Sequence, residues 1–243
     1  MIKWITIFFC ISTSSFASKV PLNEKSAGVS ANLKHFHRFS PSIKSLVELN
    51  TGKENKLSQR RDFKLGLRAR IHKNVKISAY YQRSYGLRHQ NDWIVKDGKW
   101  HWIDSSDRGE NIFGTSISLK ELVSLNILEF KTSIERNFKN NHNTLKLRPG
   151  ITHIFLNDGS PFINIFLQYE AYFPLNYHDE LIYKKGIYSG VLYHWRKNIK
   201  PGLFFKVTES TWSNSDTAIS KGVEAYKVKD RNSSIGLTLN LYY

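Results

Sequence analysis

The sequence predicts an antiparallel, up-and-down β-barrel that spans a membrane, and three observations lead to this fold class. Apolar and polar residues alternate with period two along many segments. These segments are about ten residues long, which matches a tilted membrane-spanning strand, whereas strands of soluble proteins more often have about five or six residues. Short and long connections also follow one another in turn, as in barrels whose turns and loops lie on opposite sides of a membrane.

The alternation is clearest in the last segment of the chain, SSIGLTLNLYY. One face of this segment is apolar and ends in an aromatic residue, and it carries Ile235, Leu237, Leu239, Leu241 and Tyr243. The residues between them are small or polar. Residues 63–71, 75–82 and 162–173 show the same pattern, so we expect strands with two unlike faces.

Ten spanning segments account for residues 42–243. Their ranges are 42–50, 60–71, 75–84, 111–120, 125–136, 144–155, 162–173, 183–195, 201–211 and 233–243. Residues 27–37 and 218–228 alternate weakly, and counting both as strands gives twelve. Twelve strands would move the long connection 85–110 to the side of the short turns, so ten is preferred and residues 18–41 become a periplasmic lead-in or a partial plug.

A soluble β-sandwich or lipocalin-like barrel, with the aliphatic face turned inward, is the alternative to a membrane barrel. It would leave a very basic outer surface. Aromatic residues near the segment ends favour the membrane barrel, because they resemble the two aromatic girdles at the membrane interfaces. These residues are Phe173, Tyr183, Tyr193, Trp195 and Tyr243.

The first 17 residues have the three parts of a secretory signal peptide. Lys3 gives a positive start, residues 5–11 are mostly apolar, and Ser15-Phe16-Ala17 is a cleavage signal, so we expect cleavage after Ala17. Cys10 is the only cysteine and lies in this leader, so an exported mature chain has no disulfide. The net charge of +16 favours anionic partners, and nucleic acid is excluded for an exported chain without a stacking motif.

Together, the leader, the amphipathic segments and the final Tyr243 resemble those of bacterial outer-membrane β-barrel proteins. The resemblance concerns architecture and extends to porin-like barrels and to small barrels of uncharacterised families. It implies a place in the outer membrane of a Gram-negative bacterium. It also implies that the assembly machinery of that membrane reads the C-terminal strand. A fold of this kind does not by itself define a function.

The polar face is expected to carry a charged network in the lumen. Its members are Lys64, Arg68, Arg70, Lys76, Glu129, Lys146, Arg148, Glu170, His194 and Lys206. Ten strands enclose little more space than side chains fill, so a packed network with a structural or surface-binding role is preferred. The alternative is a narrow pore that prefers anions because cations are in excess.

The longest connection contains Trp93, Trp100 and Trp102 around an Asp-Gly turn, which predicts a hairpin. Clustered tryptophans favour either a surface-binding site for sugars or lipid headgroups, or a hairpin packed on itself.

A hydrolase at the rim, either a protease or a lipid-modifying enzyme, is the last alternative, because the strand number is similar to that of the omptin proteases, which pair acids with a histidine at the outer rim. The nearest candidates are His101 with Asp104 or Asp107, and His178 beside Asp179. His35 and His37 alternate on one face without an evident third ligand, so no metal and no cofactor is expected.

Basic residues near the predicted outer ends could bind the phosphates of lipopolysaccharide, since anionic surfaces attract basic side chains. They are Arg60, Arg61, Arg83, Arg88 and Lys139.

Overall fold

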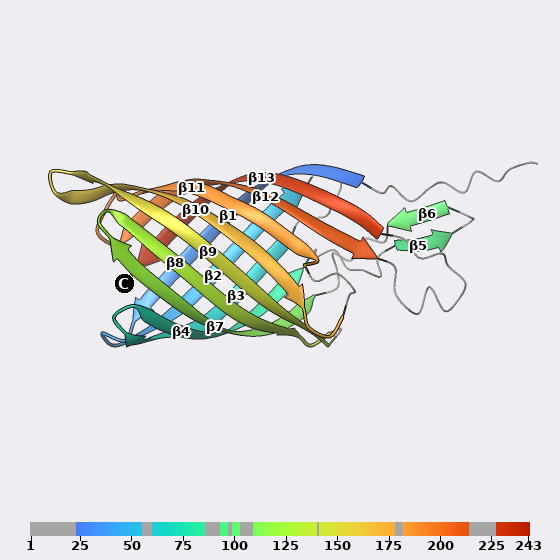
Figure 1. Cartoon of the computed structure of the whole chain (residues 1–243), viewed down its shortest axis with the longest axis horizontal. Coiled ribbons are helices and arrows are strands. Elements are labelled where there is room, and N and C mark those ends of the chain that lie inside the picture. Colours follow the sequence, from blue (N-terminus) through green and yellow to red (C-terminus); the bar gives the residue numbers. More distant parts are fainter. Residues whose placement is uncertain are drawn as a thin grey trace, which may run out of the picture.

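The computed structural model describes residues 23–54, 60–85, 93–96, 99–102, 109–139, 141–177, 182–213 and 227–243. Eleven strands of this part of the chain form one closed barrel, in the order β1-β13-β12-β11-β10-β9-β8-β7-β4-β3-β2 (Figure 1). Strands β5 and β6 form a separate two-stranded ribbon. Within the described ranges, no helix is long and apolar enough to cross a membrane. The predicted signal peptide lies outside the described residues.

The strands of the barrel are 10 to 16 residues long. Their bounds are β1 Asn23–Arg38, β2 Ile43–Glu54, β3 Arg60–His72, β4 Val75–Tyr85, β7 Glu110–Val123, β8 Asn126–Asn137, β9 His142–Asn157, β10 Ser160–Pro174, β11 Lys184–Tyr193, β12 Ile199–Ser213 and β13 Lys227–Tyr242. The ribbon consists of β5 Trp93–Lys96 and β6 Lys99–Trp102. Each strand of the barrel is long enough to cross a hydrocarbon layer when tilted.

The predicted counts of ten or twelve strands are both wrong, because β1 closes the barrel between β2 and β13. Residues 18–41 are predicted as a lead-in or plug, yet Asn23–Arg38 forms a wall strand. β1 pairs antiparallel with β2 and parallel with β13, where Ala31 lies opposite Leu237. The outward residues of β1 include Ala27 and Ala31, and such small side chains give only a weak alternation in the sequence.

The two ends of the barrel differ. Tyr243 lies at one end, which we call the turn end, together with the connections 39–42, 73–74, 124–125, 158–159 and 194–198. We call the opposite end the loop end, because the longer connections 86–109 and 175–183 join barrel strands there. β1 runs parallel to β13, so the first residues of β1 lie at the loop end, away from Tyr243. In Figure 1 the C-terminus and the β5–β6 ribbon accordingly lie at opposite ends.

The turn chemistry predicted at residues 157–160 is confirmed. Asp158 and Gly159 have positive φ angles of 49° and 74° and connect β9 to β10. Two consecutive positive φ angles define the type I′ turn that suits the twist of a hairpin. The predicted hairpin in the longest connection is also confirmed, because β5 and β6 pair with Trp93 opposite Trp102.

The aliphatic face of the strands points out of the barrel. Leu237 is 61% exposed and Leu67 is 58% exposed, whereas Thr238 and Asn240 between the outward leucines of β13 are buried. A soluble barrel or sandwich with an aliphatic interior is therefore contradicted. One aromatic residue departs from its predicted face, because the ring of Tyr183 packs against Tyr177 at 5.5 Å between ring centroids.

Candidate functional site: the charged lumen

The inward faces of the strands line a lumen that holds a cavity of about 560 Å³. All eleven barrel strands contribute lining residues, because the period-two alternation turns every second side chain inward. The lining is dominated by serine, threonine, asparagine and charged side chains. The chemistry of this site is therefore that of a polar, ionic interior.

Each of five lumenal carboxylates has a cationic partner. Lys120 Nζ lies 2.7 Å from Glu129 Oε2, and Ser118 Oγ donates to the other oxygen of Glu129 at 2.9 Å. The remaining pairs are Lys34 with Glu48 at 3.7 Å, Arg60 with Asp62 at 3.0 Å, Arg148 with Glu170 at 3.4 Å, and Lys146 with Glu135. Pairing of this kind stabilises charges that are withdrawn from bulk water.

Aromatic rings cross the lumen by lying over glycines of the neighbouring strand. The ring of Tyr80 on β4 covers Gly114 on β7, where a Cβ atom would lie 2.4 Å from Tyr80 Cζ. The Tyr80 hydroxyl reaches past β7 and donates to Glu135 on β8. The ring of Phe204 covers Gly236 in the same way, at 2.3 Å from the position of a Cβ atom. A side chain at either position would have to displace the ring that covers the glycine.

Other lumenal cations lie over aromatic faces. Lys64 Nζ is 4.5 Å from the centroid of the Tyr80 ring, and the guanidinium of Arg68 is 5.3 Å from the Phe36 ring. Lys206 lies 5.0 Å from the Tyr188 ring. Cation–π contacts of this type contribute about 0.5–2 kcal/mol each, depending on desolvation.

Most residues of the predicted lumen network line this cavity. They are Lys64, Glu129, Lys146, Arg148, Glu170 and Lys206. Arg68 joins them through its contact with Phe36, and Lys76 interacts electrostatically with Glu129. Arg70 is exposed, and its backbone N–H donates to Ser42 at the turn end. His194 lies beyond the end of β11, and its Nε2 atom is buried without a hydrogen-bond partner among the described residues.

The prediction missed four important lumenal residues, which are Lys34, Glu48, Tyr80 and Lys120. Tyr80 could have been found by counting in steps of two from Lys76 and Ser78, which share its face. Lys34 was hidden because it belongs to β1, the strand that the predicted count omits.

The surface-loop candidates have no described side chains, so their predicted roles are not tested. The backbones of Trp93, Trp100, His101 and Trp102 lie in the β5–β6 ribbon, and their side chains are outside the described part. Asp104, Asp107, His178 and Asp179 also lie outside the described residues. The pairing of these rim acids and histidines therefore stays a prediction.

His35 and His37 each contact an aromatic ring near the turn end, with centroid distances of 5.4 Å to Tyr243 and 5.1 Å to Phe39. Over the ranges that the structure describes, no group of three or more His, Cys, Asp or Glu side chains could hold a metal ion.

Comparison of the sequence with models of known protein families gives no match, and comparison with characterised proteins gives none either.

Proposed function

We propose that the protein is a barrel of the bacterial outer membrane, with a structural or surface-binding role and a basic, occluded lumen. The observation that carries this proposal is the outer surface of the closed barrel. It is covered by exposed aliphatic side chains on strands around the barrel, such as Leu65 at 49% on β3, Ile117 at 54% on β7, Leu167 at 52% on β10 and Leu203 at 55% on β12. Soluble monomeric proteins rarely expose continuous apolar surface on this scale.

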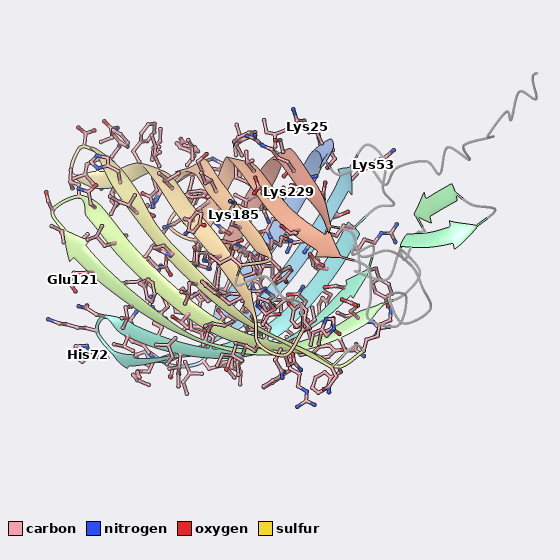
Figure 2. All side chains as sticks on the ribbon, turned by 45° about the vertical axis from the view of Figure 1, so that its right-hand side comes forward. Lys25, Lys53, His72, Glu121, Lys185 and Lys229 are labelled. Atoms are coloured by element: carbon pink, nitrogen blue, oxygen red, sulfur yellow. The ribbon has the colours of Figure 1, made fainter. Side chains whose placement is uncertain are left out.

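Exposed aromatic residues near both ends of the barrel support a membrane between them. Those near the turn end are Phe155, Phe162, Tyr193, Trp195 and Tyr243, and those near the loop end are Phe63, Tyr81, Tyr85, Phe113 and Phe138. Outward charged residues also occur toward the ends, and Figure 2 shows His72 and Glu121 at the turn end and Lys25 and Lys53 toward the loop end. An apolar band between two aromatic girdles is typical of membrane barrels.

The proposed orientation places the turn end in the periplasm, because outer-membrane barrels have short periplasmic turns and longer external loops. Tyr243 then lies on the periplasmic side, where the assembly machinery would read the C-terminal strand. The first residues of β1 would lie on the external side, because β1 is parallel to β13.

Two features of the lumen support occlusion over conduction. Ion pairs join neighbouring strands along the wall, and the rings of Tyr80 and Phe204 extend over adjacent strands inside it. An eleven-stranded barrel is closer to the eight strands whose interior side chains fill than to the sixteen strands of water-filled porins. The cationic excess in the cavity keeps an anion-preferring pore as the second candidate.

An outer groove of about 1140 Å³ supports lipid as a partner. Its apolar wall includes Leu49, Phe63 and Leu239, and Arg61 and Arg83 line it toward the loop end. Arg83 is held in place by Asn111 and by the Tyr85 hydroxyl, at 2.5 Å and 3.2 Å. An acyl chain on the wall and a lipopolysaccharide phosphate at the arginines would match this arrangement. Of the other predicted phosphate ligands, Arg60 pairs with Asp62.

Two measurements test the proposal. Refolded protein should float with lipid vesicles in a density gradient and resist extraction at alkaline pH, whereas a protein that stays soluble without detergent would overturn the membrane assignment. In a planar bilayer, inserted protein should give no stable conductance. A reproducible, anion-selective conductance would replace the occluded lumen by the pore.

A third measurement tests the lipid partner. Lipopolysaccharide should raise the thermal stability of the refolded wild type more than that of Arg83→Gln. Equal stability with and without lipopolysaccharide would contradict a phosphate site at this rim.

A further inference from the structure

The middle of the lumen brings together four cationic side chains from three strands. Lys131 on β8 lies directly opposite Arg148 on β9 in the strand register. The charge of Lys131 also interacts with those of Lys64 and Arg68 on β3, which two strands separate from β8 in the barrel order. Like charges directly opposite on neighbouring strands destabilise a sheet, so this cluster needs compensating negative charge.

The nearby carboxylates are engaged elsewhere. Glu129 contacts Lys120 and Ser118, and Glu170 accepts a hydrogen bond from the Tyr172 hydroxyl at 2.9 Å in addition to its contact with Arg148. Glu48 accepts a hydrogen bond from Asn32 at 2.8 Å and pairs with Lys34. The fourth carboxylate, that of Glu135, is shared by Lys146 and Tyr80.

Three of the four cations consequently make no direct ion pair in the described part of the chain, and carboxylates act on them only at longer range, Glu48 and Glu135 on Lys64 and Glu129 on Arg68 and Lys131. In the described part of the chain, no carboxylate oxygen lies within 4.0 Å of Lys131, Lys64 or Arg68. Lys64 and Arg68 have aromatic faces as partners, but Lys131 has no hydrogen bond, ion pair or ring contact with any described residue. Arg148 Nε is buried and also has no hydrogen-bond partner there.

The cavity of about 560 Å³ adjoins this cluster, because Lys131, Lys64 and Arg148 all line it. Lysine and arginine together are the side chains that proteins use to bind phosphate, since the ammonium supplies a point charge and the guanidinium supplies a planar set of donors. A cavity of this volume holds a small anion with its remaining water.

We propose that the lumen binds a multiply charged oxyanion of the phosphate class, held by Lys131, Lys64 and Arg148 with Arg68 adding positive charge. The bound oxygens would lie in the cavity that Lys131 lines, and would supply the hydrogen bonds that its ammonium lacks in the described part of the chain. The site is closed by the barrel wall and does not depend on the membrane assignment.

Binding of inorganic phosphate to the full chain, refolded in detergent micelles, tests the site. Isothermal titration in chloride buffer at constant ionic strength should show saturable binding with one phosphate per chain. Lys131→Met should weaken it about tenfold or more, since a hydrogen bond to a charged group contributes about 1.5–3 kcal/mol. Absence of saturable binding to the wild type would overturn the proposal.

Lys229→Met is the matched control, because Lys229 is exposed on β13 and its loss changes the net charge equally (Figure 2). Phosphate affinity should be unchanged in this variant. An equal loss of affinity in both variants would show that phosphate responds only to overall charge, which contradicts a lumenal site.

The unfolding temperature is a second readout, and it separates the loss of the phosphate site from a failure of the variant to fold. Without phosphate, Lys131→Met should unfold at the same or a higher temperature than the wild type, because it removes one of the mutually repelling charges. Phosphate should raise the unfolding temperature of the wild type and of Lys229→Met, but not that of Lys131→Met. A destabilised Lys131→Met protein that phosphate still stabilises would contradict the proposal.

Discussion

Replacing Leu237 by arginine tests whether the outer face of the barrel meets hydrocarbon. Leu237 lies on β13 midway between Arg231 and Tyr243, since 237 − 231 and 243 − 237 are both six residues. Six residues of strand span about 20 Å, or about 14 Å of depth at a tilt of about 45°. The outer surface between Arg231 and Tyr243 is then about 28 Å thick, close to the roughly 25 Å apolar band of such barrels. Leu237 lies at the middle of this band.

The expected cost of Leu237→Arg follows from this depth. At the midplane of a bilayer an outward arginine destabilises a barrel by about 2–4 kcal/mol. The side chain of Leu237 is 61% exposed, so in water the same substitution would change stability by no more than about 0.5 kcal/mol. The two surroundings therefore differ by a measurable amount.

Equilibrium unfolding in urea, with the barrel folded into lipid vesicles, measures this difference. With a slope of about 1–3 kcal/mol per molar urea, the midpoint for Leu237→Arg should fall by about 1–2 M. Ser233→Arg, two residues from Arg231, is the control and should cost only about 0–1 kcal/mol because it lies near the interface. A change below about 0.5 kcal/mol for Leu237→Arg would refute the membrane assignment.

Three further variants, two single and one double, test the barrel itself. Gly114→Val should destabilise it by about 1–3 kcal/mol through the clash with the Tyr80 ring, and an unfolding midpoint equal to that of the wild type would contradict the packing described. Glu135→Gln removes the charge that pairs with a lysine and weakens the acceptor of the Tyr80 hydroxyl, so it should cost about 1–3 kcal/mol in the same urea assay; unchanged stability would mean that this network is not formed. In a chain without Cys10, the pair Ala31→Cys and Leu237→Cys should oxidise to a disulfide that non-reducing electrophoresis detects. Failure to cross-link would contradict the pairing of β1 with β13.

The alternation of the sequence was enough to predict the class of fold and the direction of each face. Residues 162–173 and 233–243 each have one continuous apolar side, at every second position from Ile163 and from Ile235, so these sides could be assigned from the sequence. The turn at Asp158-Gly159 could also be predicted from the sequence, because few residue types adopt the positive φ angles that both of its central positions need. Both the alternation and the turn depend only on residues close together in the chain, so one sequence is enough to predict them.

The closure of the barrel could not be predicted from the sequence in this way. β1 alternates only weakly, and its place depends on backbone pairing with two strands, one of which is about 200 residues away in the chain. Backbone hydrogen bonds are common to all residue types, so they leave no residue pattern that identifies the partner strand. The number of strands and the location of the N-terminal end of β1 follow from that pairing.

By itself, the sequence determined an all-β chain with amphipathic strands, an aliphatic outer face and a cationic inner face, because period-two alternation is a property of each strand alone. Only the tertiary structure decided how many strands close the barrel and which charges meet inside it. Whether Glu129 pairs with lysine or arginine, and whether Lys131 keeps a counter-ion, depends on which residues face each other across separate strands. Those encounters are set by register and closure, and register is a relation between strands that no single segment contains.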